Sequence, residues 1–141
     1  MADLPLNSLI AALAAGNAVV LKPSEHAPTC AALLAELLPR YVDAAAVRLV
    51  QGGVAETTAL LAQRFDSIMY TGSPAVGKIV MAAAAKHLTP VLLELGGKNP
   101  VIVDATANLR AAAQAIVRAR CTNAGQICIG AEYVLVEAAV E

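Results

Sequence analysis

The chain has 141 residues, ten of them basic and eleven acidic, so its formal net charge is −1 at pH 7. This length suits a single domain, and the balanced charge argues against a nucleic-acid-binding surface and against a polybasic membrane anchor. Hydrophobic residues make up 58% of the chain and aromatic residues 3%, so the core must consist mainly of Leu, Ile, Val and Ala.

Short apolar runs alternate with segments of helical periodicity along the whole chain, a pattern that predicts an α/β fold with a parallel sheet covered on both faces. A change in character after Asp104 predicts a boundary between a nucleotide-binding part, residues 1–104, and the start of a second part, residues 105–141. The predicted elements in chain order are helix Ser8–Ala15, strand Ala18–Leu21, helix Pro28–Tyr41, strand Val47–Val50, helix Ala55–Gln63, strand Ser67–Tyr70, helix Pro74–His87, strand Val91–Leu95, strand Pro100–Asp104, helix Leu109–Cys121 and strand Tyr133–Glu137.

The cysteines and the apolar runs bear on the cellular compartment. Cys30, Cys121 and Cys128 are odd in number and irregularly spaced, which fits a reducing compartment better than a disulfide framework and shows no zinc-ligand spacing. No apolar run reaches the roughly 18 residues of a membrane span, and the N-terminus lacks the pattern of a secretory signal. The sequence therefore predicts a cytoplasmic protein without a metal site.

Polar and glycine-rich motifs follow several of the predicted strands, where ligands of open parallel sheets bind. Lys22 and Glu25 follow the first strand and could hold ribose hydroxyls and a phosphate; alternatively, both are solvated loop residues. Gly52 follows the second strand, and Ser73 precedes a helix whose free amide groups suit a pyrophosphate. Alternatively, these two positions are an ordinary strand-ending turn and a helix N-cap.

Glu94 lies at the end of the apolar strand Val91–Leu95. A carboxylate in such a run would be partly desolvated, which raises its pKa towards a value useful for a general base. The alternative is an edge carboxylate that pairs with Lys98.

Cys128 lies between glycine-containing segments, Gly125-Gln126 and Ile129-Gly130, where a substrate could reach a thiol. Cys30 lies among alanines of a predicted helix and is expected to be buried, as is Cys121. A buried, unreactive cysteine is the general expectation for any single cysteine.

These motifs in this order resemble the aldehyde dehydrogenase superfamily, from Lys22-Pro-Ser-Glu25 through Gln51-Gly-Gly53 and Tyr70-Thr-Gly-Ser73 to Glu94-Leu-Gly-Gly-Lys-Asn-Pro100 and Cys128. The phrases Gly52–Thr58 and Ala82–Pro90 are most similar to its class 3 branch. The resemblance implies a truncated form of that fold: a Rossmann-like parallel sheet with flanking helices, followed by the start of a catalytic domain.

The resemblance also implies roles for single residues. Cys128 matches the nucleophile that forms a thiohemiacetal and then a thioester, and Glu94 matches the general base that hydrolyses it. The remaining matches are cofactor-binding positions for NAD or NADP: Lys22, Glu25, Gly52, Ser73 and Leu95. The implied reaction is the oxidation of an aldehyde to a carboxylic acid.

The chain resembles only a middle segment of that family, so little activity is expected of it alone. Its partners are expected to be a small aldehyde and the cofactor, with no nucleic acid, and a homo-oligomer is expected through the full-length protein. The alternative is a non-catalytic nucleotide-binding or interaction module derived from the family.

Overall fold

The computed structural model describes residues 3–141, and every predicted strand and helix is present in it. Apart from the start of the first helix, the bounds agree with the prediction or differ from it by one or two residues. The start of the first helix was predicted wrongly: it begins at Asp3, and Ser8 lies inside it, where its Oγ donates to the Leu4 carbonyl at 3.1 Å. The elements are α1 (Asp3–Ala14), β1 (Val19–Leu21), α2 (Pro28–Tyr41), β2 (Val47–Leu49), α3 (Val54–Leu61), β3 (Ile68–Gly72), α4 (Pro74–Ala85), β4 (Val91–Leu95), β5 (Asn99–Val103), α5 (Leu109–Cys121), η1 (Thr122–Gly125), β6 (Ala131–Val136) and η2 (Ala138–Val140).

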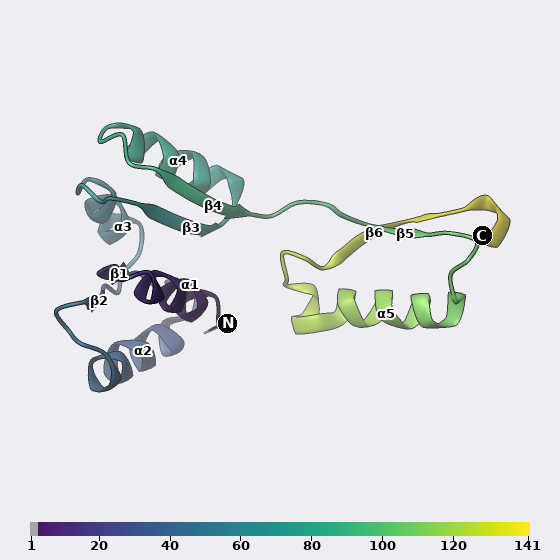
Figure 1. Cartoon of the computed structure of the whole chain (residues 1–141), viewed down its shortest axis with the longest axis horizontal. Coiled ribbons are helices and arrows are strands. Elements are labelled where there is room, and N and C mark those ends of the chain that lie inside the picture. The colour runs from purple at the N-terminus through teal and green to yellow at the C-terminus, as the bar shows by residue number, and fades with distance from the viewer. Residues whose placement is uncertain (1–2) are drawn as a thin grey trace. The chain divides into compact units, whose positions relative to one another are not determined.

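The chain divides into two compact units, drawn in Figure 1. The first contains the described residues up to Thr71 together with Val76–Leu93, and the second contains Gly72–Ala75 and Glu94–Glu141. The predicted division at Asp104 into nucleotide-binding and catalytic parts stays a prediction, because compactness alone does not assign a function to either unit.

The first unit has its core where α1 packs on β1 and β2. Leu9, Leu21 and Val47 are buried there, and Leu6 and Leu38 pack against them. Strands β1 and β2 are parallel, as expected for strands joined through a helix, with Val19 opposite Val47 and Leu21 opposite Leu49. This pairing places the segments that follow both strands, Lys22–Glu25 and Gln51–Gly53, at the same end of the pair.

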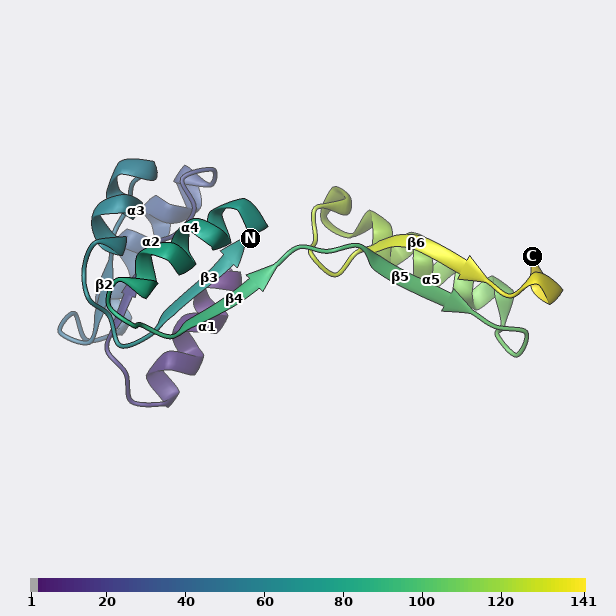
Figure 2. The same ribbon diagram turned by 90° about the horizontal axis from the view of Figure 1, so that it is seen from above.

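The second β-α-β segment of this unit is β3–α4–β4. Ile68 N donates to Pro90 O at 3.0 Å where the two strands begin side by side, and Figure 2 shows α4 beside them. Val80 and Ala84 of α4 are each only 2% exposed. Gly77 of the same helix is buried too, so the helix packs closely along one face.

The second unit consists of the parallel pair β5–β6 with α5 along one of its faces (Figure 2). Asn108 caps α5, because its Oδ1 accepts from Ala111 N at 3.0 Å. The register shifts between Asn99, opposite Ala131, and Pro100, opposite Tyr133, so Glu132 is an extra residue in a β-bulge. A bulge suits this position because proline has no N–H to donate to the ladder.

The described strands form three separate two-stranded pairs, β1–β2, β3–β4 and β5–β6. The α/β class with parallel pairing and flanking helices is confirmed, but the single sheet covered on both faces is not formed within residues 3–141. The strands are only three to six residues long, and the helices leave part of each strand pair uncovered. Apolar side chains therefore remain exposed on them, among them Met69, Leu92, Ile102 and Leu135.

Leu9→Ala is expected to lower the free energy of unfolding by about 2–5 kcal/mol, because a buried leucine loses its apolar contacts and leaves a cavity. Leu9 is 3% exposed, whereas its neighbour Ile10 on the same helix is 63% exposed. Urea unfolding should therefore show a much smaller change for Ile10→Ala. Equal losses in the two variants would contradict the core described here.

Candidate functional site

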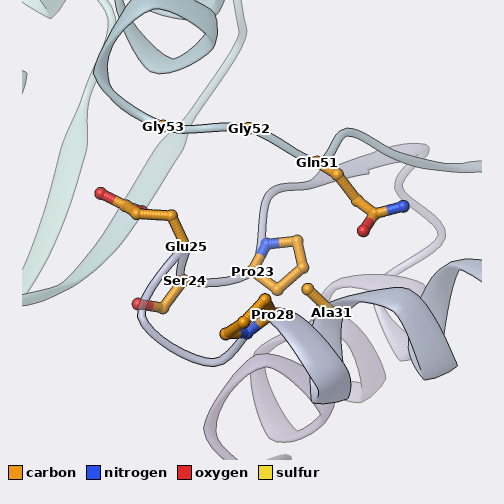
Figure 3. A pocket seen from close by; sticks show the side chains of 8 residues that line it. All are labelled: Pro23, Ser24, Glu25, Pro28, Ala31, Gln51, Gly52 and Gly53. Carbon is orange, nitrogen blue, oxygen red and sulfur yellow. The ribbon is translucent and has the colours of Figure 1, made fainter.

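A pocket of about 280 Å³ lies in the first unit, at the end of β1 and β2 where both polypeptide segments leave the strands. Figure 3 shows the segment after β1 and the start of α2 on one side and the segment after β2 on the other. The lining residues are Pro23, Ser24, Glu25, Pro28, Ala31, Gln51, Gly52 and Gly53. The predicted site residues Glu25 and Gly52 are thus brought together, as the parallel pairing of β1 and β2 requires.

Lys22 holds the first wall of this pocket in place. Its Nζ lies 3.1 Å from Glu25 Oε2 and donates to the Pro23 carbonyl at 2.9 Å. The Lys22 side chain is only 14% exposed, so it is not a freely solvated loop residue, while that of Glu25 is 41% exposed. Hydrogen bonds from its own backbone amide and then from Lys22 lower the pKa of Glu25, which keeps the carboxylate ionised.

Glu56 shapes the second wall and was missed by the sequence analysis. Its Oε2 accepts from Gly53 N at 2.7 Å and so caps the start of α3; Gly53 has no side chain that could return the bond, so only this half of a capping box is present. Gly52 has a φ of +142°, and a Cβ there would collide with Glu56 Cγ, so the backbone approaches this side chain closely. The spacing Gly53-x-x-Glu56 was the signal that could have identified the cap.

Backbone hydrogen bonds, its own amide first and then that of Gly53, lower the pKa of Glu56; the positive charge of Lys22 contributes as well. A lowered pKa favours the charged form in the folded state. The contributions of Glu25 and Glu56 to stability are therefore present at neutral pH and are lost as the pH falls through their folded pKa values. Of these three charged groups, Glu25 lines the pocket itself, whereas Lys22 and Glu56 hydrogen-bond to the segments that form its two walls.

The candidate nucleophile lies in the second unit. Cys128 is exposed and unpaired, in a turn closed by a hydrogen bond from Gly130 N to Ile127 O at 3.1 Å. The expectation that Cys30 and Cys121 are buried is wrong, because both are exposed as well. Cys30 lies on α2 and Cys121 at the end of α5, each outside the packed face of its helix. Accessibility alone therefore does not identify Cys128 as the nucleophile.

The partial burial expected for Glu94 is also wrong, since its side chain is exposed at the end of β4. The alternative pairing of Glu94 with Lys98 is not the one observed: Lys98 Nζ lies 3.5 Å from Glu132 Oε2, and Arg120 Nη1 lies 3.4 Å from Glu132 Oε1. Leu95, next to Glu94, is 37% exposed.

The predicted site residues divide between the two units. Lys22, Glu25 and Gly52 belong to the first unit, and Ser73, Glu94, Leu95 and Cys128 belong to the second. Ser73 is exposed and directly precedes α4. A broader depression on α5 is lined by one helix face, Ala113, Gln114, Val117 and Arg118, and includes none of the predicted residues.

Among the helices of residues 3–141, none combines the length and the hydropathy that a membrane-spanning segment needs. The same described part of the chain contains no group of three or more His, Cys, Asp or Glu side chains arranged to hold a metal ion.

Comparison with known proteins gives one consistent family. The model of the "Aldehyde dehydrogenase family" matches residues 2–141. Aldehyde dehydrogenase family 3 member H1 of Arabidopsis thaliana is 54% identical over 134 residues, which are 94% of this chain and 28% of that protein. The rat (Rattus norvegicus) protein named aldehyde dehydrogenase, dimeric NADP-preferring, is 53% identical over 139 residues, 99% of this chain and 31% of that protein.

Solved structures agree with the sequence matches. A structure described as the substrate-bound state of Staphylococcus aureus AldH superposes with a TM-score of 0.91 at 44% identity, over 97% of this chain and 30% of the other. A putative aldehyde dehydrogenase from Burkholderia cenocepacia gives a TM-score of 0.85 at 47% identity, over 94% and 29% of the two chains. The chain thus spans about a third or less of the relatives that it matches.

Proposed function

Because this chain belongs to the aldehyde dehydrogenase family, we propose that it takes part in the NAD- or NADP-dependent oxidation of an aldehyde to a carboxylic acid, with Cys128 as nucleophile. The observation that carries the proposal is an exposed thiol in a glycine-flanked turn of a chain that matches this family over residues 2–141. Since the chain spans only 28% to 31% of its curated relatives, full activity belongs to a longer protein of this kind.

The pocket beside Lys22 fits one part of a dinucleotide cofactor. Whole small-molecule sites measure about 300–1,000 Å³, so a pocket of about 280 Å³ suits a fragment such as a nucleoside. Glu25 can accept from ribose hydroxyls, Lys22 can donate to them, and Gly52 lines the opposite wall of the pocket. Ser73 and Leu95 are proposed to bind the pyrophosphate and the nicotinamide end.

When bound, the nicotinamide cofactor supplies the oxidant, because it accepts a hydride from the substrate carbon. The thiolate of Cys128 first forms a C–S bond with the aldehyde carbon, and after oxidation this carbon is held as a thioester. Glu94 then removes a proton from water, whose oxygen attacks the thioester carbon. The C–S bond breaks, the carboxylic acid leaves, and the thiol of Cys128 is restored.

A second candidate function is favoured by one observation: all residues that line the pocket at the end of β1 and β2 belong to the first unit, whereas Cys128 belongs to the second. A non-catalytic nucleotide-binding module would need only that unit. We also propose that the protein resides in a reducing, cytoplasmic compartment, because its three cysteines are unpaired. We further propose a homo-oligomer that forms through the longer protein.

The test of the proposed function is the formation of reduced cofactor from a small aldehyde and NAD or NADP, followed in single-turnover and steady-state experiments. Reduced cofactor that forms only when both aldehyde and chain are present supports aldehyde oxidation. Cofactor binding without any reduction would instead support the nucleotide-binding module.

Lys22→Met is expected to weaken NAD binding about tenfold or more, because a charge-assisted hydrogen bond is lost at a side chain that is 14% exposed. Lys86→Met, at an exposed lysine just beyond α4, removes the same charge as a control and should leave affinity unchanged. Calorimetric titration measures both, and equal weakening in the two variants would mean that net charge, not this pocket, governs binding.

A further inference from the structure

Asn99 links the start of β5 to the turn that carries Cys128. Its Nδ2 donates to the carbonyl oxygen of Cys128 at 2.7 Å and to that of Gly130 at 3.1 Å. Both partners are acceptors, so the amide must present its nitrogen, and its two N–H groups are both used. The two bonds hold the Cys128–Ile129 and Gly130–Ala131 peptide groups.

The strand register explains why Asn99 reaches this turn. Asn99 lies opposite Ala131, the first residue of β6, and the turn Ile127–Gly130 runs directly into that strand, as the adjacent β5 and β6 in Figure 2 show. Gly130 is buried, and a Cβ there would lie 3.0 Å from Ile127 Cγ2, so the turn is closely packed at this end.

The segment before Cys128 is held by local contacts. Asn123, Ala124 and Gly125 have φ values of 50°, 58° and 77°, and Asn123 Nδ2 donates to Gln126 O at 3.0 Å. Cys128 therefore lies between a left-handed stretch on one side and the Asn99 contacts on the other. Its own carbonyl is one of the two groups that Asn99 holds.

We propose that Asn99 is a positioning residue for Cys128: it fixes the Cys128 carbonyl and thereby the backbone that directs the thiol. The direction of the Cα–Cβ bond follows from the backbone, and misplacing a reacting group by 1 Å can cost about 10²-fold in rate. The inference rests on the proposed role of Cys128 as nucleophile. The contact itself can be tested without any aldehyde turnover.

The test compares the alkylation of single thiols by iodoacetamide, in buffer and in urea, from neutral to alkaline pH. One series keeps only Cys128 (Cys30→Ser with Cys121→Ser), and a second keeps only Cys121 as an exposed reference on α5. Each series contains four proteins: one with Asn99 unchanged, and the variants Asn99→Ala, Asn99→Ser and Asn108→Ala. The last removes the N-cap of α5 and serves as a control for general destabilisation.

With Asn99 present, Cys128 is expected to react more slowly in buffer than in urea, because a held thiol offers fewer directions of approach. Asn99→Ala should raise the rate in buffer about tenfold, towards the urea rate, through the loss of two hydrogen bonds. Asn99→Ser keeps one donor and should give an intermediate rate at Cys128, and neither variant should change the rate at Cys121.

A Cys128 rate that is the same in buffer and urea with Asn99 present overturns the proposal, as does a rate that Asn99→Ala leaves unchanged. Equal changes at Cys128 and Cys121, as expected for Asn108→Ala, would assign Asn99 a merely structural role and also overturn it. If Asn99→Ala does not fold, Asn99→Ser decides by the same criteria. Aldehyde oxidation that survives Cys128→Ser would refute the proposed function separately.

Discussion

Cys128→Ser is expected to lower the single-turnover rate of aldehyde oxidation by about 10³-fold or more, the scale seen when an enzyme loses its nucleophile. A cysteine is a few per cent thiolate at neutral pH and strongly nucleophilic, whereas a serine hydroxyl without an adjacent base is not. The formation of reduced cofactor, followed by absorbance after rapid mixing with aldehyde, measures the effect.

Cys30→Ser and Cys121→Ser are the matched controls, because the thiols of Cys30, Cys121 and Cys128 are all exposed. Both controls should keep the parent rate. A similar loss in either of them, or full activity in Cys128→Ser, would refute the assignment of the nucleophile.

Glu94→Gln is expected to slow thioester hydrolysis by about 10²–10⁴-fold, because the amide cannot take a proton from water. The first turnover needs no such base and should be affected much less. The variant should therefore release one equivalent of reduced cofactor per chain in a burst and then proceed slowly.

Glu36→Gln is the control for Glu94→Gln, since Glu36 is an exposed carboxylate on α2 that pairs with Arg40. It should show no burst and the parent rate. A Glu94→Gln variant that loses the first turnover and the later ones equally would contradict the role of Glu94 as the base for hydrolysis.

Local sequence signals were sufficient for most of the fold. Helices α2 and α5 have their predicted bounds, Pro28–Tyr41 and Leu109–Cys121, because a proline at the start of one and an asparagine cap at the other mark where they begin. Strand β4 also has its predicted bounds, bordered by Pro90 and Gly96. The start of α1 was less accurate, since Ser8 can both cap a helix and bond within one.

Properties that depend on packing were predicted less well. Burial of Cys30 and partial burial of Glu94 were inferred from apolar neighbours in sequence, and burial of Cys121 from the general expectation for a cysteine. Exposure depends instead on which elements cover a residue, and all three residues are exposed. The expected single sheet also depends on long-range pairing, and the described strands form three separate pairs instead. The chain spans about a third or less of the length of the relatives that it matches.

The site shows the same division between local and long-range information. The Lys22–Glu25 pair and its proximity to Gly52 follow from two motifs at the ends of neighbouring parallel strands. The contact of Asn99 with the Cys128 turn joins residues 29 positions apart. It depends on the register of β5 and β6 and on the bulge at Glu132, which sequence patterns alone did not indicate.

The most direct test of the account is to locate the acyl group formed during oxidation. The chain is mixed with a small aldehyde and NAD or NADP, quenched in acid and digested, and the peptides that contain Cys30, Cys121 and Cys128 are compared by mass. The account predicts an acyl group on Cys128, formed only with cofactor present and enriched in Glu94→Gln. An acyl group on Cys30 or Cys121, or none on any cysteine while reduced cofactor accumulates, would contradict it.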